Sequence, residues 1–270
     1  MRTRTRQQRK RSNFQTFSRP QRILVIPDAH NPFMDMHCFN LILQVAKRFK
    51  YDFCVLLGDW NDHYSQSRFT KDPTRAQWVT LEYELGVGEH NLELLTKALG
   101  KQCYKVITLG NHDMHFYRTI AERAPDYHFI IKDFDLYGCK RLGWHVVPYK
   151  DSFTLGKVSF THDLERSGKT AALHAPRDMM GSYIFGHNHT LLSYVCGDKD
   201  NIPYLGLSLG WIGDFEKIDY RHKVRAKCDW TKCIGEGLVM EDGSFQIHPR
   251  VFLPGHRLIV GGQVFTSTHK

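Results

Sequence analysis

The sequence predicts an α/β fold in which short buried strands alternate with helices and end in polar residues. Three apolar runs support this prediction, at residues 23–26, 53–57 and 104–109, and stretches with helical spacing separate them. Strand–helix–strand units of this kind form parallel sheets with strands buried on both faces. Because open α/β sheets bind ligands at the carboxyl ends of their strands, the polar residues after each run predict where the functional site lies.

The elements of the first half follow in order. Residues 23–26 form a strand that ends in PDAH at 27–30, and residues 35–50 have the spacing of a helix. The strand at 53–57 ends in Gly58-Asp59, and the strand at 104–109 ends in GNHD at 110–113. Between these two strands, residues 74–99 predict one or two helices, interrupted near Gly86 and Gly88.

The second half is richer in strands. A strand is expected at 144–147, then a hairpin about Gly156 that ends in Thr161-His162, then a strand at 183–185 that ends in GHNH at 186–189. Further strands are expected at 191–195 and 204–209, and a hairpin over 238–251 turns at Asp242-Gly243, a favoured type I′ dipeptide. Without a repeat or a clear linker, we expect residues 23–270 to form a single domain.

The charge of the chain is concentrated at its start. The formal net charge is +9, and residues 1–22 hold eight basic residues and no acidic one, which leaves about +1 for the rest (9 − 8). We expect a disordered basic arm over 1–22. Such an arm either binds a polyanion or only solubilises the chain, and the two readings have equal weight.

The remaining composition bears on location. No apolar run reaches the roughly 20 residues of a membrane-spanning helix, and the start lacks the apolar region of a secretory signal. The seven cysteines are scattered without CxxC spacing, as expected of reduced thiols. These features predict a cytoplasmic protein without membrane contact, and they leave its oligomeric state open.

Metal-ligand chemistry follows nearly every strand. Imidazole together with carboxylate oxygen suits Mn, Fe or Zn better than Ca or Mg. Two neighbouring cations also need a carboxylate between them to offset their repulsion, and Asp59 is the natural bridge. The candidate ligands are Asp28, His30, Asp59, Asn111, His162, His187 and His189.

The ordered set DAH, GD, GNHD, a lone histidine and GHNH, over residues 23–189, resembles the calcineurin-like metallophosphoesterase superfamily. The GNHD ending looks closer to its nuclease and phosphodiesterase branches, and the compact chain with a basic start resembles enzymes encoded by bacteriophages. The resemblance implies a two-sheet β-sandwich flanked by α-helices in four layers. It also implies two divalent cations, with Mn²⁺ foremost and Fe, Zn or Ni as alternatives.

The resemblance further implies roles for the ligands. One cation would be held by Asp28, His30, Asp59 and His189, and the other by Asp59, Asn111, His162 and His187. His174 and His145 are rivals to His162. The cations would activate a bridging water.

His112 is implied as the catalytic acid, because it follows the ligand Asn111 and would face the leaving oxygen. Asp62 matches the family carboxylate that pairs with this histidine, and Asp113 is the competing partner.

The substrate is less constrained. In the protein phosphatase branch an arginine follows the residue at position 62, whereas this chain has His63, which disfavours phosphoprotein substrates. A basic track that would lie on one face of an extended strand favours nucleic acid, with Trp211, Tyr220 and Trp230 available for stacking; it consists of Arg221, Lys223, Arg225 and Lys227. The track is as readily a solvated edge balanced by nearby acidic residues. The hypotheses are a phosphodiesterase or nuclease, a phosphomonoesterase for nucleotides or small metabolites, and a non-catalytic binding protein.

Overall fold

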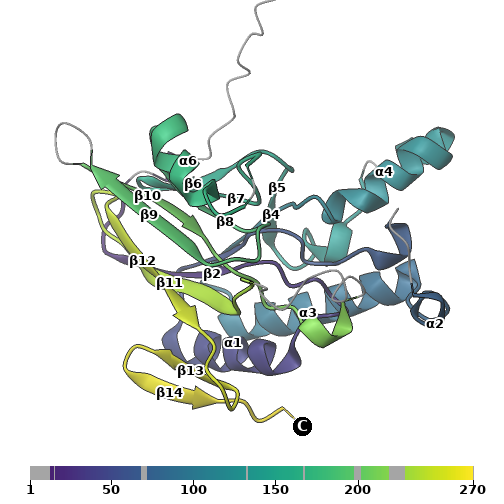
Figure 1. The fold of residues 1–270 in the computed structure, drawn as a ribbon, viewed down its shortest axis with the longest axis horizontal. Helices are drawn as coiled ribbons and strands as arrows, with labels where there is room; N and C mark the ends of the chain where they lie inside the picture. Colours follow the sequence, from purple (N-terminus) through teal and green to yellow (C-terminus); the bar gives the residue numbers. More distant parts are fainter. Residues whose placement is uncertain are drawn as a thin grey trace, which may run out of the picture.

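The computed structural model describes residues 13–14, 16–67, 72–131, 133–166, 168–197, 202–218 and 229–269. Two six-stranded sheets make up the centre of this part of the chain, and a two-stranded hairpin lies beside them (Figure 1). The basic track at 221–227 falls outside the described residues.

One sheet has the order β12-β11-β2-β3-β4-β5. Its parallel strands β2 to β5 alternate with helices, and β11 joins β2 in antiparallel fashion. The alternation was predicted as far as β4, whereas the helices between β4 and β5 were not predicted. The bounds are β2 (Gln21–Ile26), β3 (Phe53–Leu56), β4 (Tyr104–Thr108), β5 (Trp144–Val147), β11 (Cys233–Val239) and β12 (Phe245–Val251).

The other sheet has the order β1-β6-β7-β8-β10-β9, with β7, β8 and β10 parallel to one another. Its strands are β1 (Asn13–Phe14), β6 (Phe153–Leu155), β7 (Val158–Thr161), β8 (Ser182–Phe185), β9 (Leu192–Gly197) and β10 (Pro203–Ser208). The separate hairpin consists of β13 (Arg257–Val260) and β14 (Gln263–Thr266).

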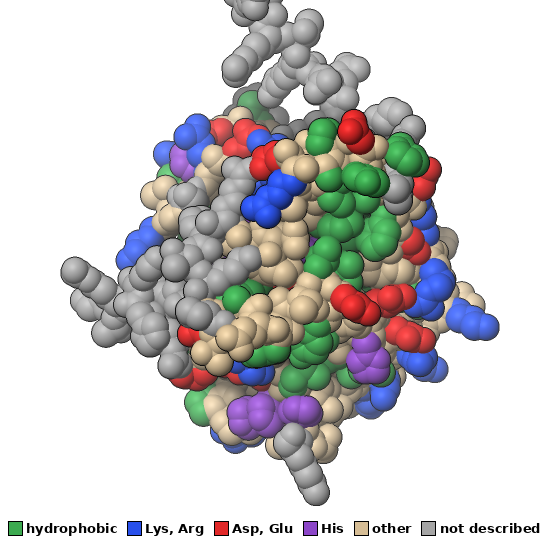
Figure 2. All heavy atoms as spheres, turned by 90° about the vertical axis from the view of Figure 1, so that its right-hand side faces the viewer, with side chains coloured by type: hydrophobic (Ala, Val, Ile, Leu, Met, Phe, Trp, Pro, Cys, Tyr) green, Lys and Arg blue, Asp and Glu red, His purple; other side chains and the backbone are tan. Residues whose placement is uncertain are grey.

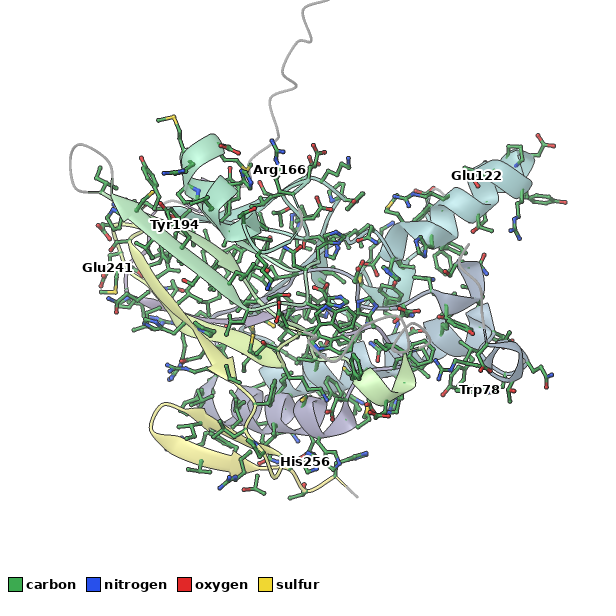
Figure 3. The ribbon with its side chains drawn as sticks, viewed as in Figure 1. Trp78, Glu122, Arg166, Tyr194, Glu241 and His256 are labelled. Carbon is green, nitrogen blue, oxygen red and sulfur yellow. The ribbon has the colours of Figure 1, made fainter. Side chains whose placement is uncertain are left out.

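The layers follow from the alternation of buried side chains. Val25 and Val55 point toward the second sheet, where they pack in one cluster with Phe153 and Phe160. Their neighbours on β2 and β3 point the other way and pack against α1 (Met36–Phe49) and α3 (Leu81–Leu99). Helix α6 (Ala171–Asp178) covers the outer face of the second sheet. Side chains fill the space between the layers (Figure 3), and the predicted four-layer sandwich is confirmed.

The remaining helices are short or lie at the edge. They are η1 (Tyr64–Gln66), α2 (Pro73–Ala76), α4 (Asp113–Arg123), η2 (Pro125–Tyr127), α5 (His128–Ile131), η3 (Leu136–Gly138) and η4 (Phe215–Lys217). Figure 2 views the side that carries α2 and α4, where hydrophobic side chains gather among charged ones. In the described part of the chain, no helix is long and apolar enough to cross a bilayer, and the six described cysteines are free.

Three expectations need correction. Gly86 and Gly88 do not interrupt a helix, since both lie inside the continuous α3. Part of the expected arm is ordered, because β1 pairs with β6 and β2 begins at Gln21, while residues 1–12 and 15 lie outside the described residues. The hairpin turn at Asp242-Gly243 is not type I′, which needs positive φ at both residues; of the two only Gly243 has one, at 79°.

Candidate metal centre

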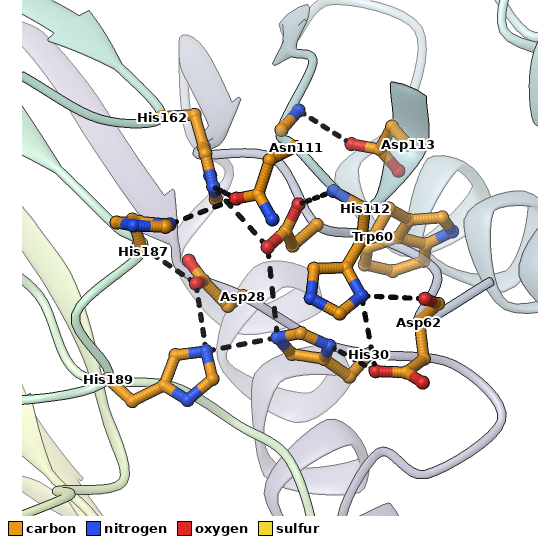
Figure 4. A network of polar contacts seen from close by, with 12 residues as sticks. Asp28, His30, Trp60, Asp62, Asn111, His112, Asp113, His162, His187 and His189 are labelled. Atoms are coloured by element: carbon orange, nitrogen blue, oxygen red, sulfur yellow. Dashed lines mark hydrogen bonds and ion pairs between the residues drawn. The ribbon is translucent and has the colours of Figure 1, made fainter. Parts of the chain in front are cut away.

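Five loops meet at one edge of the sandwich, and each follows a strand that the sequence predicted. The loops after β2, β3 and β4 leave the same edge because these strands are parallel, and the loops after β7 and β8 do so for the same reason in the other sheet. Figure 4 shows the side chains of Asp28, His30, Asn111, His162, His187 and His189 turned toward a common centre. The convergence of the predicted ligands is therefore observed.

The first ligand cluster consists of Asp28, His30 and His189. His189 Nε2 lies 3.2 Å from Asp28 Oδ2 and 3.0 Å from His30 Nε2. His30 Nδ1 faces the Asp62 carboxylate at 2.8 Å and carries its proton there, so Nε2 of the neutral ring presents a lone pair to the centre. Asp28 Oδ1 is buried and has no hydrogen-bond partner among the described residues.

The second cluster consists of Asp59, His162 and His187, with Asn111 between them. Asn111 Oδ1 lies 2.9 Å from both His162 Nε2 and His187 Nδ1. Asp59 Oδ2 is 3.3 Å from His162 Nε2 and 4.0 Å from His30 Nε2 of the first cluster. Asp59 therefore stands between the two clusters, where a bridging carboxylate is expected.

The environment of His162 shows that the donors fit a cation. Its Nδ1 donates to the carbonyl oxygen of Leu57 at 2.8 Å, so Nε2 of the neutral ring is an acceptor. That nitrogen faces oxygens of Asp59 and Asn111, which are acceptors as well. Acceptors this close need a proton or a metal ion between them, and imidazole, carboxylate and amide donors together suit divalent transition-metal ions.

The pKa values give the same picture for the protein without cations. Burial lowers the pKa of His162, but the negative charge of Asp59 outweighs burial and raises it to about 10. Burial also lowers the pKa of His30, and its contact with Asp62 raises it to about 9. Burial raises the pKa of Asp59, yet the charges of His162 and His112 hold it well below its usual range. Protons thus occupy positions that a bound cation would take.

The backbone of the ligand loops is strained. Four candidate ligands have a positive φ, which non-glycine residues rarely adopt, with values of 53° for His30, 45° for Asp59, 67° for His187 and 56° for His189. Each such residue costs about 1–2 kcal/mol. Strain of this kind gathers at functional sites, because only the surrounding structure holds it in place.

Two motif glycines are required by space alone. A Cβ on Gly110 would lie 2.1 Å from Asp59 Oδ1, and one on Gly186 would lie 2.1 Å from Asp28 Oδ1. Neither glycine has a positive φ. The glycine that opens the Gly-Asn-His motif and the one that opens the Gly-His-Asn motif are therefore required because the carboxylates of Asp59 and Asp28 pass so close to these loops.

His112 lies beside the clusters with its side chain 24% exposed. Its backbone N–H donates to Asp59 Oδ1 at 2.8 Å, and its Nδ1 donates to the carbonyl oxygen of Asp62 at 2.7 Å. The Asp62 carboxylate is 3.4 Å from the same nitrogen but only 2.8 Å from His30. Asp62 thus contacts both histidines, with the shorter carboxylate contact to the ligand His30.

Asp113 does not orient His112. Its carboxylate accepts hydrogen bonds from the backbone N–H of Gly110 at 2.8 Å and from the hydroxyl of Tyr137 at 2.6 Å. Among the described residues, no contact joins its side chain to the His112 ring. The alternative that Asp113 pairs with His112 is therefore wrong. The reason is geometric, since residue 113 begins α4 and its side chain turns back toward the preceding loop.

The rivals to His162 lie elsewhere. His174 is on α6, where its Nδ1 is 2.6 Å from Asp178, and His145 is exposed on β5. His162 is fully buried at the centre of the second cluster. The preference for His162 among the three candidates agrees with this placement.

Helix α3 holds the metal loops in ways that the sequence analysis missed. The Trp60 indole donates to the carbonyl oxygen of Gly88, and the Asn61 amide donates to that of Glu84. A Cβ on Gly88 would lie 2.2 Å from Asn61 Oδ1, which explains this glycine inside the helix. The Glu84 carboxylate accepts from the backbone of Tyr64, and burial raises its pKa to about 7. The polar residues on the otherwise apolar face of α3 were the sequence feature that could have indicated these contacts.

Aromatic rings line the centre on the side of His189. Trp211 stacks on the His189 ring with centroids 5.0 Å apart, and Trp230 meets the same ring edge-on at 4.5 Å. Trp211 is buried, whereas Trp230 is partly exposed. The two tryptophans that sequence analysis suggested for stacking thus lie beside the candidate ligand His189. Tyr220 lies outside the described residues.

Comparisons with known proteins were consistent with this site. A family model described as calcineurin-like phosphoesterase matches residues 21–170, which is 150 of the 270 residues and more than half of the chain. The comparison with curated proteins finds no match.

Several solved structures resemble the chain at low identity. Vacuolar Protein Sorting 29 from Cryptosporidium parvum has a TM-score of 0.45 and 13% identity, with 92% of this chain and 96% of that chain covered. A single mutant of Vps29 from Entamoeba histolytica has a TM-score of 0.44 and 12% identity, with 90% and 96% covered. The phosphoesterase Yfce from E. coli has a TM-score of 0.39 and 13% identity, with 84% and 98% covered.

Proposed function

This chain belongs to the calcineurin-like phosphoesterase family, and we propose that it hydrolyses phosphodiester bonds of nucleic acid with two divalent cations, most readily Mn²⁺. The observation that carries the proposal is the place of Asp59. One of its carboxylate oxygens lies between two clusters of ligands, and the other accepts from the backbone of His112. Cation binding, charge compensation and the candidate acid therefore meet at a single side chain.

The roles of the ligands follow from the clusters. Asp28, His30 and His189 would hold one cation, and Asn111, His162 and His187 the other, with Asp59 shared. When bound, the cations supply an activated water and neutralise charge on the phosphoryl oxygens. Asp62 fixes the orientation of His30 through Nδ1, as carboxylates commonly do for metal-binding histidines.

His112 is the proposed general acid. Since its Nδ1 donates to the carbonyl oxygen of Asp62, its Nε2 is the nitrogen left to serve the leaving oxygen of a substrate. The hydrogen bond from its backbone to Asp59 keeps the ring next to the cation ligands. Proton donation by a positioned imidazole is worth about 10²- to 10⁴-fold in rate.

Nucleic acid is the proposed substrate on grounds of charge and stacking. Of the eight basic residues among the first 22, Arg19 and Arg22 pair with Asp52 and Glu236 in the fold, and the other six lie within residues 1–12 without an acidic residue among them. A sequence of this charge suits a polyanion. The partly exposed Trp230 beside His189 could stack a base next to the scissile phosphate. His63, which stands where the protein phosphatase branch has an arginine, is buried and cannot contact a substrate as a surface residue would.

A substrate panel tests the proposal. Purified protein is assayed with Mn²⁺ and with chelator on bis(p-nitrophenyl) phosphate, oligonucleotides, p-nitrophenyl phosphate and nucleoside monophosphates. We expect Mn²⁺-dependent cleavage of the diesters. Activity confined to monoesters would reject the nucleic-acid proposal and favour a phosphomonoesterase. A protein that binds Mn²⁺ but leaves every ester intact would favour a binding protein.

A pair of histidine variants links activity to the site. His112→Ala should keep its cations and lose about 10²- to 10⁴-fold in turnover. His174→Ala removes an imidazole of α6, which contacts Asp178 instead of the ligands, and should keep wild-type activity. Equal activity of the two variants would remove His112 from the chemistry.

A further inference from the structure

A buried chain of hydrogen bonds runs behind the loop that carries Asn111 and His112. His63 Nε2 is 2.7 Å from the hydroxyl of Tyr137, and this hydroxyl is 2.6 Å from Asp113 Oδ1. The other oxygen of Asp113 accepts the backbone N–H of Gly110 at 2.8 Å. The side chains are 0%, 2% and 0% exposed for His63, Tyr137 and Asp113. None of the three is a cation ligand or touches the place of a substrate.

The direction of the chain follows from donors and acceptors. An ionised Asp113 only accepts, so the Tyr137 hydroxyl donates to it and must in turn accept from His63. His63 therefore carries its proton on Nε2. Its Nδ1 is then an acceptor, and it is buried without a hydrogen-bond partner among the described residues. The three side chains form one connected and directed network.

The backbone at two members of the network is strained. His63 has φ of 50° and Tyr137 has φ of 57°, both in the left-handed region. Neither residue type favours this conformation, which costs about 1–2 kcal/mol per residue. The hydrogen bond between the two side chains is one interaction that holds both residues in place.

The network joins two loops of the metal centre. His63 follows Asp62, which contacts both His30 and His112. Asp113 follows His112 and fixes Gly110, the residue before the ligand Asn111. We propose that His63 and Tyr137 are positioning residues that set the place of Asn111 and His112 through Asp113. This inference rests on the proposed function.

Removal of the Tyr137 hydroxyl oxygen tests this positioning role. Tyr137→Phe leaves Asp113 Oδ1 and His63 Nε2 buried without partners, which frees the loop at 110–113 to shift. We expect kcat on bis(p-nitrophenyl) phosphate to fall about ten- to hundredfold, because displacements near 1 Å have such effects. KM should stay unchanged, since neither residue reaches the substrate. Of the two Mn²⁺ binding steps, the one that uses Asn111 should weaken.

Tyr51→Phe is the matched control. Tyr51 is equally buried, lies outside the network, and its hydroxyl has no hydrogen-bond partner among the described residues. This variant should match wild type in kcat and in both Mn²⁺ steps. A folded Tyr137→Phe that also matches wild type would overturn the inference. A rise in KM with unchanged kcat would overturn the inference too, because that would place Tyr137 in substrate binding.

A histidine pair keeps the inference testable if Tyr137→Phe does not fold. His63→Gln retains an N–H that can reach the Tyr137 hydroxyl, and His63→Leu does not. We expect His63→Gln to restore most of the kcat and Mn²⁺ binding that His63→Leu loses. Equal losses in both would mean that ring packing, and not the hydrogen bond, matters there, and would refute the proposal.

Hydrogen exchange separates this inference from the proposed function. In cation-free protein, peptides that cover 104–116 should exchange faster in Tyr137→Phe than in Tyr51→Phe, because the Asp113 carboxylate, which accepts from the Gly110 amide, is then no longer held by the Tyr137 hydroxyl. Wild-type protein without phosphoesterase activity would refute the proposed function, yet the exchange and Mn²⁺ measurements would still decide the positioning role. Unchanged exchange would refute that role whatever the activity.

Discussion

Substitution of Gly110 by alanine is the sharpest test of how the metal centre is built. The added Cβ would lie 2.1 Å from Asp59 Oδ1 and 2.5 Å from the backbone nitrogen of Asp59, whereas ordinary contacts begin at 3.4 Å. The difference between 3.4 and 2.1 Å means that the carboxylate and the loop must separate by 1.3 Å. Since Gly110 does not have a positive φ, alanine is allowed by its backbone, and the effect is steric.

The size of the effect follows from this displacement. A shift near 1 Å in a catalytic group costs about 10²-fold in rate, which corresponds to about 2.7 kcal/mol of lost transition-state stabilisation. Overpacking should lower the free energy of unfolding by about 1–3 kcal/mol. Because Asp59 lies between both clusters, the affinity for both cations should fall.

The assay compares kcat/KM on bis(p-nitrophenyl) phosphate and Mn²⁺ binding by titration calorimetry. Gly86→Ala is the control, because a Cβ there meets nothing within 4 Å and the residue lies inside α3. That variant should keep activity and gain up to about 1 kcal/mol of stability. A folded Gly110→Ala with wild-type turnover and two bound cations would refute the reasoning.

Three further predictions concern charge. Asp59→Ala should lose both cations in calorimetry, and retention of two would refute the bridge. The pKa values of His30 and His162 are raised to about 9 and about 10, so a cation that binds at these residues must displace protons. Mn²⁺ affinity should therefore rise with pH, by up to about tenfold per pH unit for each proton displaced. A pH-independent affinity would contradict this. Burial lowers the pKa of His63 to about 3, so the folded state favours its neutral form. The stability that this provides is complete above pH 6.5 and is lost as the pH falls, by about 2 kcal/mol between pH 7 and 5. Urea unfolding should therefore show the gap between wild type and His63→Gln narrowing on acidification, whereas a constant gap would exclude the effect.

Local patterns predicted the strands and the ligand loops well. The apolar runs before Asp28, Asp59 and Asn111 became parallel strands, because side chains buried on both faces leave a continuous apolar signal. Turn chemistry was less reliable. The Asp242-Gly243 dipeptide suggested a two-residue turn, yet the hairpin closes over 240–244, where Asp242 instead accepts from the backbone of Ser244.

The glycines show why helix boundaries were missed. Within a sequence, Gly86 and Gly88 look like helix breakers, since glycine costs about 1 kcal/mol in a helix. The tertiary structure explains why residue 88 is glycine, because the Asn61 side chain occupies the space where a Cβ would be. A contact between residues 27 positions apart leaves no local pattern.

The sequence by itself determined the alternation of strands and helices and the candidate ligands, because strand periodicity and the residue types of a metal site are local and chemically specific, whereas the two-sheet sandwich was implied by the family resemblance. Only the tertiary structure decided how the ligands are supported. The carboxylate of Asp62 makes its shorter contact with His30, and the carboxylate of Asp113 accepts from Tyr137. His63 is buried and bonds the hydroxyl of Tyr137. Each of these partners is chosen by the packing of loops that are distant in the chain, and burial then makes every unpaired polar group costly.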